Sequence, residues 1–382
     1  MFLTEHDLTE LMAWRRELHR KPELSGQEEK TAATVQAVLH AAGADKVVTG
    51  LGGHGVLGIY DGDTPGPTIM LRAELDGLPI QETSELAYRS LVPGSAHLCG
   101  HDGHMTILAA VARGLGRQRP KRGRAMLLFQ PAEEDGSGAA AVLADAKFDE
   151  VRPDFVFSLH NLPGLPLGQV SIADGLVNCA SRGMQIVLTG RTAHASSPEF
   201  GVSPQRAIAT LLNEITALGR GGALDEAFSM VTVTHARLGE PAFGISPGQA
   251  ELWVTLRTLT DSTMELIRQQ AEDLVQRVAA SQGLQVRITY RDVFSHCLNN
   301  AEAVAHLRGA LDAEDVRHSA QGLPMRGSED FGRFNSRSRA AMFFLGAGEQ
   351  HPSLHEPDYD FPDELIEIGA RVFMRALRNL LD

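Results

Sequence analysis

Apolar residues form two different patterns along the chain. Spacings of three and four residues predict amphipathic helices over 8–20 and 29–43. Short continuous apolar runs, which are typical of strands buried on both faces, follow at 67–76, 124–135, 154–161 and 339–348. The pattern predicts an α/β fold with a mostly parallel sheet that is covered by helices.

A different order of elements occupies the middle of the chain. Strands are predicted at 184–190, 229–238, 249–259 and 285–292, with helices at 203–218 and 262–282. This βαββαβ order is that of a ferredoxin-like α+β domain. A chain of 382 residues is also too long for one ordinary core. We therefore predict a larger domain in two parts, 1–180 and 293–382, with a ferredoxin-like domain inserted at 181–292.

Composition narrows the class of protein. Hydrophobic residues make up 43% and charged residues 22%, which is typical of a globular chain. The formal net charge of −13 argues against a nucleic-acid partner, since phosphates require a basic face. The three cysteines are too few and too scattered for a disulfide framework, and no segment has the pattern of a signal peptide or a membrane span. A cytoplasmic protein without membrane association is expected.

Polar side chains gather directly after the apolar runs. In sheets of this type, ligands bind beyond the carboxyl ends of the strands. The run 124–135 ends in Glu133 and Glu134, 154–161 ends near His160, and His355 follows 339–348. Cys99 and His101 lie in the stretch "SAHLCGHDGHMTILAA". Taken singly, each feature has a simple structural explanation, such as a turn beside a buried cysteine or a solvated acidic loop. Four such features, each after an apolar run, are better explained by one site.

The residue types point to a metal-dependent hydrolase. Thiolate, imidazole and carboxylate groups suit zinc or a related first-row divalent ion. More than four such groups favour two cations that share one site, an arrangement that activates water. Of the adjacent Glu133 and Glu134, one can bind metal while the other acts as general base.

Seven motifs then identify a resemblance that covers essentially the whole chain. They are "RAELDGLP", "CGHDGHMT", "QPAEED", "SLHN", "GRTAHASSP", "GSEDF" and "SLHEPDYDF". In this order the chain resembles the dinuclear metallopeptidase/amidohydrolase family, which includes hippurate hydrolases, aminoacylases, indole-acetyl-amino-acid hydrolases and, more distantly, carboxypeptidase G. The resemblance implies cleavage of the amide bond of an N-acyl amino acid by a cytoplasmic homodimer, with 1–180 and 293–382 as the catalytic domain and 181–292 as the dimerisation domain.

The resemblance also implies roles for individual residues. Two divalent metal ions per subunit, zinc by default and manganese, nickel or cobalt as alternatives, would be bound by Cys99, His101, Glu134, His160 and His355. Glu133 would be the general base on a water that bridges the metals, and Asp76 would orient the site. Asp102 and His104 would support the loop that carries Cys99 and His101, here called the ligand loop, without binding metal themselves.

Two further residues lie in the inserted domain. In the family, the histidine that His194 matches reaches the active site of the partner subunit, where it stabilises the oxyanion and contacts substrate. The alternative for His194 is a surface histidine on a serine-rich loop. Arg257 matches an arginine near the substrate carboxylate, and its alternative is an exposed strand residue.

Three positions depart from the family pattern. Glu74 replaces an aspartate, Ser203 stands where an aspartate is usual, and Gly244 stands where an asparagine commonly contacts the substrate carboxylate. These departures put the substrate preference in question and leave the chemistry intact.

Other functions stay open at this stage. Within hydrolases, the alternative is a dipeptidase or carboxypeptidase acting on small peptides. Outside them, it is a non-catalytic dimeric protein that binds metal or ligand, which the presence of Glu133 beside a full ligand set argues against. A nucleotide-dependent enzyme is disfavoured, because the glycines of 50–58 match neither a P-loop nor a dinucleotide fingerprint.

Overall fold

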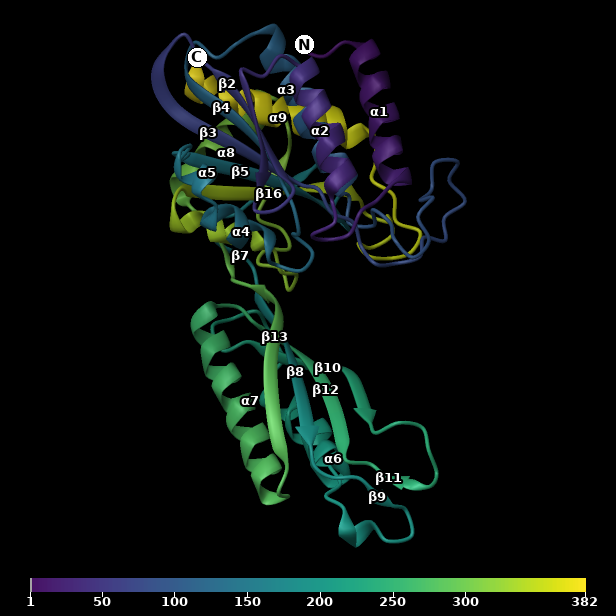
Figure 1. Cartoon of the computed structure of the whole chain (residues 1–382). Coiled ribbons are helices and arrows are strands. Elements are labelled where there is room, and N and C mark those ends of the chain that lie inside the picture. The colour runs from purple at the N-terminus through teal and green to yellow at the C-terminus, as the bar shows by residue number, and fades with distance from the viewer. Residues whose placement is uncertain (1) are drawn as a thin grey trace. The chain divides into compact units, whose positions relative to one another are not determined.

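The structure, a computed structural model, describes residues 2–382 and divides into two compact units. The first unit comprises the described residues through Val177, together with Leu298–Leu323 and Asp330–Asp382. The second comprises Asn178–Cys297 and Pro324–Glu329. Figure 1 labels the elements along the chain.

The first unit is built on an eight-stranded sheet with the order β1-β2-β4-β3-β5-β16-β6-β15. The central strands β4, β3, β5 and β16 run parallel, whereas β1 and β2 form an antiparallel edge. The strands are β1 (Lys46–Leu51), β2 (Gly55–Asp61), β3 (Thr64–Glu74), β4 (Arg122–Gln130), β5 (Phe155–Pro163), β6 (Val170–Ser171), β15 (His318–Ser319) and β16 (Arg339–Gly348). The predicted α/β fold with a mostly parallel sheet is confirmed.

Helices cover both faces of this sheet. One face carries α1 (Glu5–Arg20), α2 (Glu29–Ala41), α3 (His101–Arg117), α8 (Ala301–Ala313) and α9 (Glu364–Leu381). The other carries α4 (Gly138–Ala144) and the short helix η3 (Asp330–Ser336), which contact each other and the strands β4 and β16. The short helix α5 (Ala146–Asp149) follows α4, and a small ladder joins β7 (Gly175–Asn178) to β14 (Cys297–Asn299).

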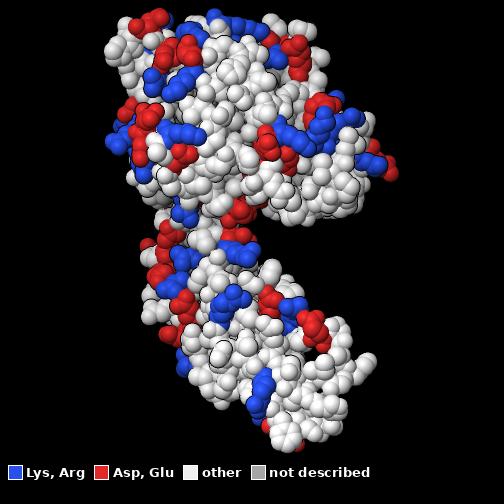
Figure 2. Space-filling model, in the orientation of Figure 1, with Lys and Arg blue, Asp and Glu red and all other residues white. Residues whose placement is uncertain are grey.

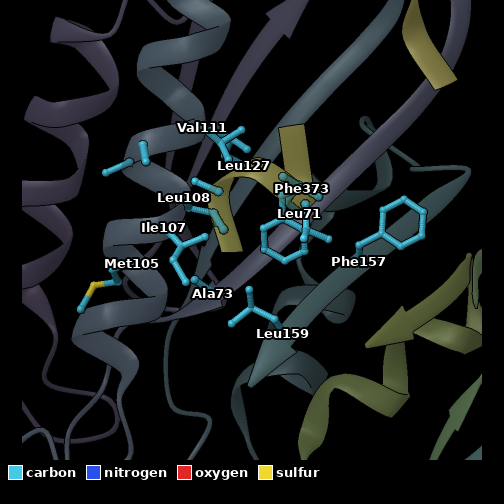
Figure 3. Close-up of a cluster of buried hydrophobic side chains, with 14 of the residues drawn as sticks. Leu71, Ala73, Met105, Ile107, Leu108, Val111, Leu127, Phe157, Leu159 and Phe373 are labelled. Atoms are coloured by element: carbon cyan, nitrogen blue, oxygen red, sulfur yellow. The ribbon is translucent and has the colours of Figure 1, made fainter. Parts of the chain in front are cut away.

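Burial on both faces explains the continuous apolar runs. Along β3, Leu71 and Ala73 enter the large core, whereas Met70 and Arg72 point to the opposite face and are equally buried. Figure 3 shows the large core, in which side chains of α3 meet those of β3, β4, β5 and α9. The central strands are thereby fixed on both sides, so the loops at their ends start from rigid positions.

The second unit has the ferredoxin-like order that the sequence predicts. Its antiparallel sheet, β10-β12-β8-β13, packs against two helices. The elements are β8 (Ala180–Thr189), α6 (Gln205–Glu214), β10 (Ser229–Leu238), β12 (Gln249–Thr258), α7 (Asp261–Ser281) and β13 (Gln285–Phe294). Shorter elements are β9 (Ala193–His194), which pairs with β11 (Ile245–Ser246), and the single turns η1 (Pro198–Phe200) and η2 (Thr216–Leu218). The segment Pro324–Glu329 also belongs to this unit, because Cys179 donates its N–H to the carbonyl of Met325.

Surface charge shows no preference for one sign on the face in view. In Figure 2, acidic and basic side chains are interspersed on that face. Within residues 2–382, no helix has the length and apolar character needed to cross a bilayer.

Candidate metal centre

The polar side chains predicted to form one site lie beyond the carboxyl ends of the parallel strands. Asp76 follows the end of β3, and Glu133 and Glu134 follow the end of β4. His160 lies near the end of β5, and His355 follows β16. Because these four strands are neighbours in the sheet, their ends deliver the side chains to one place.

Five side chains of the predicted site, including Cys99 and His101 from the segment before and at the start of α3, form two triads that share the cysteine. The ligand atoms of Cys99, His101 and His160 lie within 4.8 Å of one another, and so do those of Cys99, Glu134 and His355. Cys99 Sγ lies 3.4 Å from His160 Nε2, and His355 Nε2 lies 3.7 Å from a carboxylate oxygen of Glu134. The two triads contain all five residues that the sequence resemblance implies as metal ligands.

The backbone around Gly100 explains how Cys99 and His101 face the same point. Gly100 adopts a left-handed conformation, with φ of 90°, directly before α3. A Cβ atom at this position would lie 2.2 Å from Oδ1 of Asn161, so only glycine fits. The turn therefore places the thiol just before the helix and the imidazole in its first turn.

Hydrogen bonds fix which ring nitrogen of two histidines faces the site. His101 Nδ1 lies 2.9 Å from the backbone oxygen of Asp76, and His160 Nδ1 lies 2.8 Å from that of Asn161. A carbonyl oxygen only accepts, so each Nδ1 carries the hydrogen, and Nε2 presents its lone pair in the neutral ring. His101 Nε2 is buried and has no hydrogen-bond partner among residues 2–382. Both rings have the orientation that a metal ligand needs.

The electrostatics of the site favour a cation. Burial opposes a charge on His101, but the hydrogen bond to Asp76 and the carboxylates of Glu74 and Glu134 raise its pKa to about 10. Burial and the carboxylates of Glu134 and Glu133 raise the pKa of the Cys99 thiol well above its usual value. A thiolate among these carboxylates therefore needs a strong positive partner, which a coordinated divalent ion provides. Burial lowers the pKa of His160 to about 3, so its ring is neutral and able to bind metal.

The backbone of His355 is strained, and a hydrogen bond holds it in place. Its φ is 69°, which is unusual for a residue other than glycine and costs roughly 1–3 kcal/mol. Its N–H donates to the carbonyl of Leu98, 2.8 Å away and next to Cys99 in the chain. This bond fixes a residue from the end of the chain against the ligand loop. The side chain of His355 is 49% exposed, so the site is open to solvent on this side.

Comparison with known proteins decides the family. The model of peptidase family M20/M25/M40 matches residues 70–379 of the chain. The chain belongs to this family. It is therefore an amide-bond hydrolase of a metal-binding family, as the sequence resemblance implied.

Individual relatives are similar to this chain over nearly its full length. The hippurate hydrolase of Campylobacter jejuni is 31% identical, with 96% of this chain and 95% of the relative covered. Thermostable carboxypeptidase 2 of Saccharolobus solfataricus is 30% identical, with 96% and 95% covered. In structure, the YXEP protein of Bacillus subtilis, named as a dinuclear metal-binding peptidase of the M20 family, superimposes with a TM-score of 0.80 at 24% identity over 99% of both chains. The structural likeness confirms the fold.

A buried network beside the two triads accounts for Glu74 and His104. His104 Nδ1 lies 2.6 Å from a Glu74 carboxylate oxygen, and its Nε2 lies 2.6 Å from Oδ1 of Asn161. The amide of Asn161 donates in turn to the hydroxyl of Tyr359 at 2.5 Å. Arg72 donates to the other oxygen of Glu74. Both ring nitrogens of His104 are thus engaged, which suits the expected supporting role, and the longer side chain of Glu74 is accommodated.

Asp102 belongs to a separate buried ion cluster. It accepts from Arg15 at 3.0 Å and from His19 at 2.9 Å, both of which come from α1. Burial would raise the pKa of Asp102, but Arg15 and His19 hold it below its usual range. The start of α3 is therefore attached to the first helix of the chain.

Asp76 directs the ligand loop through its backbone as well as its carboxylate. One carboxylate oxygen accepts from the hydroxyl of Ser25 at 2.7 Å and from the N–H of Glu134 at 3.0 Å. Its carbonyl accepts from His101. Asp76 thus contacts two of the five residues of the triads, which suits the orienting role expected for it.

His194 and Arg257 lie in the second unit. Arg257 donates to the hydroxyl of Ser328 at 2.6 Å and to the carbonyl of Arg326, so its guanidinium is held by Pro324–Glu329. His194 is exposed, and its Nδ1 lies 2.7 Å from the hydroxyl of Ser196. A Cβ added at Gly244 would meet no atom within 4 Å, so the missing side chain at this family position leaves open space.

Several supporting residues could not be found from the sequence. Asn161 and Tyr359 occur within the motifs, but nothing in the motifs shows that they touch. Glu28 lies in the acidic stretch "GQEEK" just before α2, yet it is fully buried. Its contact with Ala132 joins segments 104 residues apart, so local pattern carries no signal for it.

Proposed function

We propose that the chain is an N-acyl-amino-acid amidohydrolase that holds two divalent cations. The observation that carries this proposal is the pair of triads that share Cys99, with Glu133 beside them. Cys99, His101 and His160 would hold one cation, and Glu134 and His355 would complete the second. When bound, such a pair supplies Lewis acidity that activates water and polarises an amide carbonyl.

Glu133 is proposed as the general base. Its carboxylate is buried, and Oε2 lies 4.0 Å from Nε2 of His101. Glu134, the next residue, also lies close to His101, with 3.8 Å between Oε1 and Nε2. In this assignment Glu134 binds metal, while a Glu133 oxygen takes the proton from the attacking water and passes it to the leaving nitrogen.

The proposed substrate class rests on the names of two relatives. One is named for the hydrolysis of hippurate, which supports an N-acyl amino acid. The second candidate, a carboxypeptidase acting on small peptides, is supported by the name of another relative at a similar identity. Both candidates require a free carboxylate on the substrate, for which Arg257 is the proposed partner.

A substrate panel separates the two candidates. We expect the metal-loaded enzyme to hydrolyse N-acetyl and N-benzoyl amino acids with kcat/KM roughly tenfold or more above that for dipeptides of the same C-terminal residue. Methyl esters of the same acyl amino acids are the matched control. They should lose roughly tenfold or more in kcat/KM, because a hydrogen bond to a charged group contributes about 1.5–3 kcal/mol. Faster cleavage of dipeptides would support the carboxypeptidase, and no cleavage of either would contradict both proposed substrate classes.

His194 is proposed to act in the active site of a partner subunit. The N–H of Ser196 donates to Nδ1 of His194 at 3.2 Å, so Nδ1 is an acceptor and the neutral ring carries its hydrogen on Nε2. This leaves Nε2–H as a donor on an exposed side chain, the group that an oxyanion needs. Exposed apolar side chains lie close by in sequence or across the ladder, at Phe243, Ile245 and Phe200, and they favour a covered surface. We therefore propose a homodimer.

Loss of this imidazole should affect catalysis and leave assembly intact. His194→Ala is expected to lower kcat by about 10²–10³-fold, the range for removal of one oxyanion donor. Metal content, measured by elemental analysis, and dimer size, measured by gel filtration, should stay unchanged. Near-normal kcat would show that the His194 ring is a surface group without a role in catalysis.

Mixing two inactive variants tests which subunit His194 serves. In a heterodimer of Glu133→Gln and His194→Ala chains, one active site keeps an intact Glu133 and receives an intact His194 from the other chain. Activity should therefore partly return on mixing. If subunit exchange is verified by differently tagged chains and no activity returns, the shared site is excluded.

A further inference from the structure

The turn that bears Glu133 and Glu134, together with the start of α4 that follows it, is held by three acidic side chains from different parts of the first unit. Its backbone N–H groups donate to carboxylates over 2.7–3.0 Å. The pairs are Ala132 with Glu28, Glu134 with Asp76, and Ala139 with Asp330. A charged acceptor makes a stronger hydrogen bond than a neutral one, so each contact fixes the turn firmly.

The contact with Glu28 falls at the most strained point of the turn. Ala132 has φ of 50°, in the left-handed region that side chains rarely adopt. It directly precedes Glu133, so its backbone angles set the direction of that side chain. Its N–H donates to Glu28 Oε1 at 2.7 Å, and its carbonyl accepts from Gly138 at 2.8 Å. Such a conformation persists only where the surroundings hold it.

The carboxyl of Glu28 serves this turn rather than its own helix. Glu28 precedes α2 at the capping position, yet its side chain makes no capping hydrogen bond there. The side chain is fully buried, and its Oε1 accepts from the N–H of Ala132 and from that of Gly26, the latter at 2.9 Å. Burial of an ionisable group that does not cap its helix is costly. The contact with Ala132 indicates that this buried carboxyl has a role in the turn.

We propose that Glu28 is a positioning residue that holds Ala132 in the left-handed conformation and thereby aims Glu133 and Glu134. The proposal rests on the function proposed above for these two glutamates. It extends the working parts of the site to a segment outside residues 70–379, the range that the family model matches. Ser25, in the same segment, donates to Asp76 at 2.7 Å, so the segment supports the site at two points.

Glu28→Ala tests the proposal with three measurements. We expect kcat to fall by about 10–100-fold, and the affinity for zinc to fall by a similar factor, the range for loss of an outer-shell partner of a metal site. KM should change less than kcat. Hydrogen exchange in peptides that cover 131–138 should speed up, because the Ala132 N–H loses its acceptor. This last measurement needs no activity, so it still reports on Glu28 if Glu133 proves not to be the base.

A second substitution separates positioning from general stability. Glycine adopts the left-handed conformation without strain. The double variant Glu28→Ala/Ala132→Gly should therefore recover part of the lost kcat, which repair of a fold defect elsewhere would not achieve. Glu28→Gln, which keeps an acceptor oxygen, should retain more activity than Glu28→Ala and provides the test if the alanine variant does not fold.

Glu23→Ala is the matched control. Glu23 lies in the same segment, but its carboxylate accepts from the N–H and hydroxyl of Thr31 and not from the turn. This variant should lower the melting temperature while kcat and the exchange of 131–138 stay normal. The proposal is overturned if folded Glu28→Ala keeps normal exchange in 131–138, or if Ala132→Gly restores none of the lost kcat.

Discussion

Removal of the divalent cations is expected to abolish amide hydrolysis, and their return is expected to restore it. The reason lies in the chemistry of the five ligand residues, whose carboxylates and buried thiol favour a strong cation at one place. Without a Lewis acid, Glu133 would face water whose pKa is far too high for a carboxylate base to deprotonate it. The measurement is turnover before chelation, after chelation and dialysis, and after addition of zinc, manganese, nickel or cobalt.

Elemental analysis of each preparation is the control for this experiment. Cys99→Ala should reproduce the chelated state, because Cys99 belongs to both triads. Cys179→Ala is the matched variant, since Cys179 is another buried free cysteine but lies in the second unit. It should keep both metal and activity. Full turnover by protein shown to be metal-free would refute the metal-dependent mechanism.

Replacing the base should separate catalysis from metal binding. Glu133→Gln is expected to keep the metal content of the wild type while kcat falls by roughly 10²-fold or more, the scale of general acid–base assistance. Glutamine has almost the same shape as glutamate but cannot take a proton, so KM should change less than kcat. Steady-state kinetics together with elemental analysis checks both parts.

Glu134→Gln is the matched variant on the neighbouring residue. Glu134 belongs to a ligand triad, and its backbone N–H is fixed by Asp76. This variant should lose metal on dialysis, and excess metal should restore part of its activity. Near-normal kcat in Glu133→Gln, or a similar loss of metal in both variants, would move the base to another residue.

Much of the fold is contained in local patterns of the sequence. The apolar runs identify β3, β4, β5 and β16, because a strand buried on both faces must be apolar along its length. Glu134, His160 and His355 could be placed at or after the ends of these strands for the same reason. The change of pattern after residue 184 likewise identifies the ferredoxin-like order of the second unit.

The supporting contacts could not be predicted, because they depend on which distant segments meet. The bond from Ala132 to Glu28 spans 104 residues of chain, and that from Arg15 to Asp102 spans 87. The left-handed backbone at Ala132 and His355 gives no signal either, since neither residue is a glycine. A sequence shows which groups are available, whereas the partners of a buried charge follow only from the folded chain.

The position of β16 in the sheet has a consequence for synthesis on the ribosome. This strand, made of residues 339–348, lies between β5 and β6, both of which are translated far earlier. The nascent first unit therefore exposes one side of β5 as an unpaired edge while nearly two hundred further residues are added, roughly 10–40 seconds at 5–20 residues per second. Exposed edges of this kind pair readily with other chains. The second unit, nearly continuous in sequence, is complete before that edge is covered, so we expect β5 to be the edge at which newly made chains associate until their last strand arrives.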